Sequence, residues 1–157
     1  MKKTLTFHIS IQAPRHIVWD TMLGVEGYKA WTSAFGEGSH FVGSWDEGSK
    51  IQFLGPGGGD GMTAVIAENR PCEHLSIRHL GEVSQGIEDT TSDKVKAWAP
   101  AYENYTLADE AGATTLTVSL ETVPAYEQFM LGTFPKALGL LKDLCERAAN
   151  ARVEPPP

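Results

Sequence analysis

Two ionisable side chains fall within apolar strand patterns, where an acid–base or ligand-binding role is chemically possible. His79 occupies the same alternating positions as Leu75 and Ile77 in the segment 74–80. Because side chains of a strand alternate between its two faces, His79 is expected on the apolar face. Glu103 is the second such residue, in a strand further along the chain.

Glu103 alternates with Tyr105 and Leu107 in the predicted strand 102–108. We expect this strand to form a hairpin with 114–120, around the turn 109–112. If Ala108 opposes Ala113, cross-strand pairing places the inward side chains on one apolar face. That face holds Glu103, Tyr105, Leu107, Leu116, Val118 and Leu120.

A buried carboxylate beside an imidazole has three interpretations. The two groups can simply satisfy each other's hydrogen bonds inside a sheet, as buried polar groups must in any protein. They can orient a polar group of a ligand. They can also exchange protons with a substrate, because each group would tune the protonation of the other.

Aromatic side chains supply candidate walls for a pocket around this pair. Trp31, Phe35, Phe53 and Phe134 offer flat apolar surface, although ordinary core packing is the favoured role for each of them taken alone. If Ser44 opposes Ser49, His40 joins Phe53 on the same face and becomes a weaker candidate. The candidate ligand-binding set is Trp31, Phe35, Phe53, His79, Glu103, Tyr105 and Phe134.

The elements that must position these residues follow from hydrophobic periodicity. Two short helices are expected between Pro14 and Gly24 and across 28–35, and a long helix follows Pro124. The polar, aperiodic segment 82–100 is predicted to be an insertion or a flexible loop. We expect one domain over 1–151 and a flexible proline-rich tail over 152–157. Period-two segments predict strands at 5–12, 40–44, 50–54, 62–68, 74–80, 102–108 and 114–120.

This order of elements, one strand, two short helices, about six strands and a long helix, resembles the helix-grip fold of the START-like (SRPBCC) superfamily. Several motifs resemble its branch named after activators of a heat-shock-protein ATPase. These motifs are Ala13-Pro14 with Val18-Trp19-Asp20, Tyr28 with Trp31, Gly43-Ser44-Trp45-Asp46-Glu47-Gly48-Ser49, Glu103-Tyr105-Leu107, and Phe134-Pro135-Lys136-Ala137-Leu138 with Leu141-Lys142.

The resemblance implies an α+β helix-grip fold, in which a curved antiparallel sheet of about seven strands wraps a long C-terminal helix. It also implies a cavity between sheet and helix that holds a small hydrophobic or amphipathic molecule. Because a fold does not determine a function, two alternatives stay open. One is a cyclase, lyase or hydrolase using His79 and Glu103, and the other is a co-chaperone-like interaction domain. A homodimer is plausible for small domains of this type.

Composition argues against other classes. Thirteen basic and 20 acidic residues give a formal charge of −7, which disfavours nucleic acid and anionic lipid surfaces as partners. No apolar run is long enough to cross a bilayer, so we expect no membrane insertion and a cytoplasmic location. Cys72 and Cys145 lack the spacing of a metal site, and no dinucleotide or phosphate-binding signature is present, so no metal and no cofactor are expected.

Overall fold

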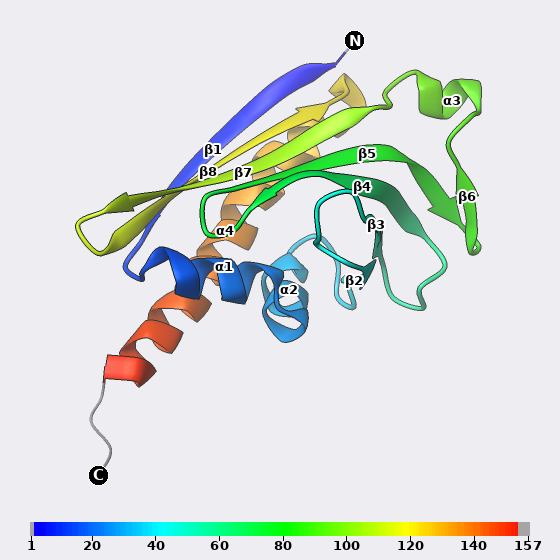
Figure 1. Cartoon of the computed structure of the whole chain (residues 1–157). Coiled ribbons are helices and arrows are strands. Elements are labelled where there is room, and N and C mark those ends of the chain that lie inside the picture. Colours follow the sequence, from blue (N-terminus) through cyan, green and yellow to red (C-terminus); the bar gives the residue numbers. More distant parts are fainter. Residues whose placement is uncertain (1, 154–157) are drawn as a thin grey trace.

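The main layer of the molecule is an antiparallel sheet of eight strands (Figure 1). The structure, a computed structural model, describes the backbone of residues 2–153 and the side chains of residues 2–151. The strand order is β1-β8-β7-β5-β4-β3-β2, and β6 pairs with β5 outside this path. The predicted α+β helix-grip fold is confirmed, with one strand more than expected. The strands are β1 (Lys3–Ile11), β2 (His40–Gly43), β3 (Lys50–Leu54), β4 (Gly61–Arg70), β5 (His74–Ser84), β6 (Ile87–Asp89), β7 (Ala101–Glu110) and β8 (Ala113–Thr122).

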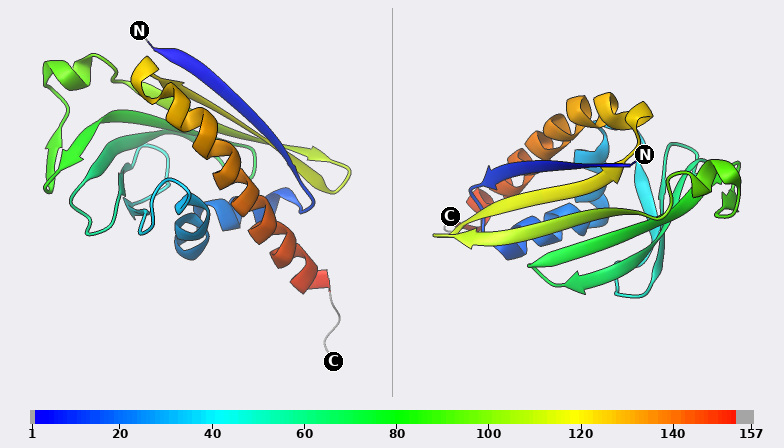
Figure 2. Two further views of the ribbon diagram at one scale, coloured as in Figure 1. Left: turned by 180° about the vertical axis from the view of Figure 1, so that it is seen from behind. Right: turned by 90° about the horizontal axis from the view of Figure 1, so that it is seen from above.

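The long helix α4 (Pro124–Val153) crosses the concave face of the sheet, as both views in Figure 2 show. It packs against β1 and against two short helices, α1 (Arg15–Leu23) and α2 (Val25–Thr32). Its buried residues recur at intervals of three and four, as expected for one helical face. The buried residues of α4 are Phe134, Ala137, Leu138, Leu141, Cys145 and Ala149. No helix within residues 2–153 is long and apolar enough to span a membrane.

The predicted tail over 152–157 overlaps the last two residues of α4, which extends through Val153. Residues 154–157 lie outside the described part of the chain. The expected single domain over 1–151 and the flexibility of the tail stay predictions.

The last hairpin has a tighter turn than the sequence predicted. Glu110 pairs with Ala113, so only Ala111 and Gly112 form the turn, with φ values of 53° and 87°. Two successive positive φ values match the hairpin turns whose twist suits the flanking strands. The expected pairing of Ala108 was wrong by two residues, which leaves every side chain on its predicted face.

The segment 82–100 is not the flexible loop that its polarity predicted. β5 continues through Ser84, β6 adds to it, and a short helix α3 (Asp93–Lys96) follows. The side chain of Ser92 accepts the backbone N–H of Val95 at 3.2 Å, which caps α3. A strand of three residues and a helix of four are too short to show a hydrophobic period, so the pattern concealed them.

Glu88 fastens β6 to the neighbouring strands. Its carboxylate accepts hydrogen bonds from Lys50 Nζ at 2.6 Å, Gln52 Nε2 at 2.5 Å and Thr63 Oγ1 at 2.7 Å. These bonds, that of Lys50 first, lower the pKa of Glu88 to about 2. Gly81 permits the close approach of β6 to β5, because a Cβ at this position would lie 2.1 Å from the carbonyl oxygen of Asp89.

Candidate functional site

The pairing of β5 with β7 brings the two predicted ionisable residues together. Ile77 lies opposite Glu103 and Leu75 lies opposite Tyr105. Because side chains repeat every second residue along a strand, His79 becomes the diagonal neighbour of Glu103 on the same face. His79 Nε2 lies 2.9 Å from Glu103 Oε1. The expected inward orientation of both residues therefore agrees with the structure.

Glu103 is the centre of a small polar cluster. One carboxylate oxygen bonds to His79 Nε2, and the other accepts the hydroxyl of Tyr105. Burial alone would raise the pKa of Glu103. The hydrogen bond and the charge interaction with His79, together with the hydrogen bond from Tyr105, outweigh burial and hold the pKa below its ordinary value. The carboxylate is consequently ionised near neutral pH while it is largely removed from bulk water.

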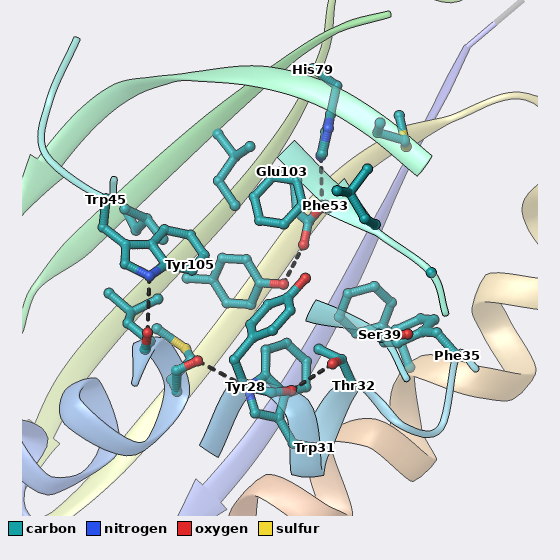
Figure 3. Close-up of a pocket in the computed structure, with 18 of the residues that line it drawn as sticks. Tyr28, Trp31, Thr32, Phe35, Ser39, Trp45, Phe53, His79, Glu103 and Tyr105 are labelled. Carbon is teal, nitrogen blue, oxygen red and sulfur yellow. Dashed lines mark hydrogen bonds and ion pairs between the residues drawn. The ribbon is translucent and has the colours of Figure 1, made fainter. Parts of the chain in front are cut away.

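Two tyrosines stay protonated beside this carboxylate. Burial, together with the negative charge of Glu103, raises the pKa of Tyr105 and of Tyr28 well above the ordinary value. Tyr28 comes from α2, and Figure 3 shows its hydroxyl pointing toward the Glu103 carboxylate. Because Tyr105 already donates its one hydroxyl hydrogen to Glu103, Tyr28 is the phenol that can donate to a ligand.

A half-open cavity of about 250 Å³ adjoins the polar cluster and is lined by residues of the sheet, α1, α2 and α4 (Figure 3). This volume lies just below the roughly 300–1,000 Å³ of most small-molecule sites, so it suits a small occupant. Its walls away from Glu103 are mostly apolar, with the hydroxyl side chains of Thr32 and Ser39 among them. All seven residues proposed from the sequence line it: Trp31, Phe35, Phe53, His79, Glu103, Tyr105 and Phe134.

Further residues that were not proposed from the sequence also line the cavity, among them Tyr28, Trp45, Met62 and Met130. Tyr28 precedes Trp31 by three positions, and that helical spacing was the available signal. Trp45 lies just after β2 and follows no strand or helix period, so its position depends on tertiary contacts. No spacing in the chain marked Met62 or Met130.

Two tryptophans of the cavity wall are tied to the end of α1. The indole N–H of Trp31 donates to the carbonyl of Met22 at 3.0 Å. The indole N–H of Trp45 donates to the carbonyl of Leu23 at 2.9 Å. Both rings are thereby fixed in orientation by backbone groups that a helix terminus leaves without an intrahelical partner.

His40, the weaker candidate, does not line the cavity. In the observed register Phe41 pairs with Phe53, one residue away from the pairing that Ser44 opposite Ser49 implied. A shift of one residue reverses the faces of a strand, so Phe41 turns inward and contacts Tyr28, with ring centroids 5.2 Å apart. His40 instead contacts the carbonyl of Gly38 at 2.9 Å.

The described residues contain no group of three or more His, Cys, Asp or Glu side chains arranged to hold a metal ion. Cys145 is buried, and burial raises the pKa of its thiol to about 11, so it is a weak nucleophile at neutral pH. The chemistry available in the cavity is therefore that of Glu103, His79 and two tyrosines.

An antiparallel sheet that wraps a long C-terminal helix, with a cavity between the two, defines a helix-grip protein. Solved structures similar to this chain have the same fold. They include protein MLL2253 from Mesorhizobium loti, at 15% identity and a TM-score of 0.70, over 92% of this chain and 98% of the other. The Aha1 dimer from Colwellia psychrerythraea matches at 18% identity and 0.68, over 92% and 96%.

CalU16 from Micromonospora echinospora is a third similar structure, at 15% identity and a TM-score of 0.61, over 96% of this chain and 87% of the other. No protein-family model matches the chain, and no curated protein sequence is significantly similar to it. At these identities the likeness establishes the fold, in agreement with the START-like, Aha1-like resemblance of the sequence motifs.

Proposed function

We propose that this protein binds a small hydrophobic or amphipathic molecule in the cavity between the sheet and α4. The observation that carries the proposal is an aromatic cavity with one ionised, hydrogen-bonded carboxylate at its wall. Few polar groups in an otherwise apolar pocket are typical of sites that orient a ligand. The cluster around Glu103 would orient a polar group, and the apolar wall would take up the remainder of the molecule.

A pair of neighbouring residues on α4 allows a matched test. Met130 lines the cavity, whereas the adjacent Leu131 is 42% exposed and does not line it. Met130→Trp should fill the cavity, and Leu131→Trp should add the same bulk outside it. Native mass spectrometry of the purified proteins and thermal unfolding with a panel of lipophilic compounds would compare both variants with the wild type.

We expect a bound molecule, or a compound that raises the melting temperature, in the wild type and in Leu131→Trp but not in Met130→Trp. Stabilisation follows because a ligand that binds only the folded state shifts the unfolding equilibrium. Equal behaviour of all three proteins, with no co-purified molecule and no stabilising compound, would refute the proposal.

A second candidate function, acid–base catalysis on the bound molecule, is supported by the His79–Glu103 contact of 2.9 Å. An imidazole held by an ionised carboxylate is a suitable general base. Incubation of each captured ligand with wild type and with His79→Phe, followed by mass spectrometry, tests it. A change in ligand mass with both proteins, or with neither, would remove His79 from any such role.

A homodimer is the partner that we propose for this chain itself. The similar Aha1 structure from Colwellia psychrerythraea is a dimer. In this chain, α4 exposes the apolar side chains of Tyr126 and Phe129, at 59% and 48%. Exposed apolar side chains of this kind favour association. Light scattering during gel filtration should report twice the mass of one chain, and the mass of one chain would contradict the dimer.

A further inference from the structure

The lining of the cavity has few charged side chains, and they are not balanced in sign. Of the residues that line it, within the described part of the chain, only Glu103 and His79 carry acidic or basic side chains, and no lysine or arginine is present. An anionic ligand would therefore meet the Glu103 carboxylate without a permanent cation to compensate it. The balance between Glu103 and His79 decides the net charge that a ligand encounters.

The Glu103 carboxylate has one partner on each oxygen. His79 Nε2 lies 2.9 Å from Oε1, and the hydroxyl of Tyr105 donates to the other oxygen. Within the described lining of the cavity, no lysine or arginine lies beside this carboxylate. Glu103 is therefore the acidic group that a ligand meets at this end of the cavity.

Aromatic rings adjoin the two partners of Glu103. The ring centroid of Phe53 lies 5.6 Å from that of His79, and the ring centroid of Trp31 lies 6.3 Å from that of Tyr105. The ring centroid of Tyr28 lies 5.7 Å from that of Trp31, 6.0 Å from that of Trp45 and 6.0 Å from that of Phe53. The faces of aromatic rings attract cations, and tryptophan and tyrosine are the strongest of them. A ring cluster next to a carboxylate is an environment in which an organic ammonium group loses little by leaving water.

We infer that the ligand of this cavity is a small organic cation, an alkyl- or arylammonium, whose nitrogen lies beside Glu103 among the rings of Tyr28, Trp31, Trp45 and Phe53. Its apolar body extends along the wall formed by Phe35 and Phe134. The inference rests on the proposed ligand-binding function and specifies its ligand class. The Glu103 carboxylate already has two hydrogen-bond donors and retains acceptor capacity, so the ammonium adds a partner without displacing one.

Three probes that share a phenyl ring and nearly the same length separate charge from shape: 2-phenylethylamine, 2-phenylethanol and phenylacetate. Isothermal titration of the full-length wild-type protein at pH 7 should give an affinity for the amine at least about tenfold higher than for the alcohol. Phenylacetate should not bind measurably. Equal affinities for amine and alcohol, or binding of phenylacetate, would overturn the inference.

Glu103→Gln keeps the size of the side chain and removes its charge. This variant should bind the amine no better than the alcohol, and its affinity for the alcohol should stay within about twofold of wild type. The control Glu110→Gln removes one exposed negative charge at the last hairpin and should leave the amine preference intact. Loss of the preference in both variants would show that overall charge, and not Glu103, creates it.

The outcomes for the two proposals are distinct. If amine and alcohol bind equally and Met130→Trp abolishes both, the ligand-binding function stands and the cation inference fails. If no probe binds, the molecule identified by native mass spectrometry decides, and a neutral or acidic occupant overturns the inference. If no probe binds and no occupant is lost in Met130→Trp, both proposals fail. The wild-type titrations do not depend on the folding of any variant.

Discussion

Glu103 combines burial with a retained charge, and its partners His79 and Tyr105 make this possible. Each carboxylate oxygen has one donor, so neither is left without a hydrogen bond. A carboxylate with this environment stabilises the fold only while it is ionised. Glu103 therefore links the stability of the protein to pH as well as lining the cavity.

We predict that Glu103→Gln lowers the free energy of unfolding by about 1–3 kcal/mol at pH 7, because hydrogen bonds to a charged group are replaced by neutral ones. The pKa of Glu103 is lower in the folded protein than in the unfolded chain. Its stabilisation is thus fully present above the ordinary carboxyl pKa of 4.5 and is lost as the pH falls through the folded value.

Urea unfolding of wild type and Glu103→Gln at several pH values would measure this difference. We expect the gap to be widest near neutral pH and to close as the solution becomes acidic. Glu110→Gln, in an exposed position, supplies the comparison with no such gap. A gap that stays constant at all pH values would mean that the loss comes from packing and not from the charge.

Among the elements, β6 depends on polar contacts more than on burial. Ile87 is 71% exposed, so little apolar surface holds this strand, and Glu88 supplies its bonds to β3 and β4. We predict that Glu88→Gln accelerates amide hydrogen exchange in β6 and leaves exchange in β7 and β8 unchanged. Because Glu88 is partly exposed, the loss of global stability should stay below about 1 kcal/mol.

Hydrogen exchange followed by mass spectrometry would localise that effect. The pKa of Glu88 falls from 4.5 in the unfolded chain to about 2 in the folded protein. Its stabilisation is therefore complete above pH 4.5 and declines as the pH falls from 4.5 toward 2. Protection of β6 in the wild type should therefore weaken over that interval. Identical exchange of β6 in wild type and Glu88→Gln would show that the backbone pairing with β5 alone is sufficient.

Phe134 contributes an aromatic contact between α4 and the sheet, and it lies between two other aromatic rings. Phe134 stacks on Phe7, with ring centroids 5.1 Å apart, and meets the edge of Phe35 at 5.0 Å. We predict that Phe134→Ala lowers the free energy of unfolding by about 3–5 kcal/mol, because removing a buried ring leaves a void. Phe134→Leu should cost clearly less.

Chemical denaturation of the two Phe134 variants measures this prediction. Phe134 also lines the cavity, so the alanine variant should accept a bulkier apolar compound than the wild type does. A cost below about 1 kcal/mol for Phe134→Ala would mean that α4 closes onto the sheet after the ring is removed.

How far sequence reasoning reached is clearest at single positions. Period-two alternation was sufficient for His79 and Glu103, because it depends only on the face of a strand. The error of two residues in the pairing of the last hairpin therefore left Glu103 on its predicted face. The predicted pairing of β2 with β3 was wrong by one residue, which exchanged the two faces of β2. His40 was therefore predicted to face inward, whereas Phe41 does so in the structure.

Contacts distant in sequence could not be predicted in the same way. Val95 is fully buried within a four-residue helix, and Glu88 is held by three residues from two other strands. Neither feature produces a period in the chain, so the segment 82–100 resembled a loop. Trp45 was not predicted as a cavity residue for the same reason. The binding roles of the lining residues and the cytoplasmic location stay predictions.

For the whole molecule, the shared core of sheet and α4 predicts cooperative unfolding. Leu116 and Val118 of β8, and Leu138 and Leu141 of α4, belong to one buried cluster. Loss of either layer exposes the apolar face of the other, so both should unfold together. Circular dichroism in the far and near ultraviolet should give coincident urea transitions. Separate transitions would contradict the single domain expected over 1–151.

The fluorescence of Trp31 and Trp45 should report whether the cavity is occupied. Indole emission depends on the polarity around the ring, and both rings line the cavity while their N–H groups are held by backbone carbonyls. A molecule that enters should change their emission without any attached label. Trp31→Phe and Trp45→Phe would assign the change to one wall or the other, and so indicate where the occupant lies.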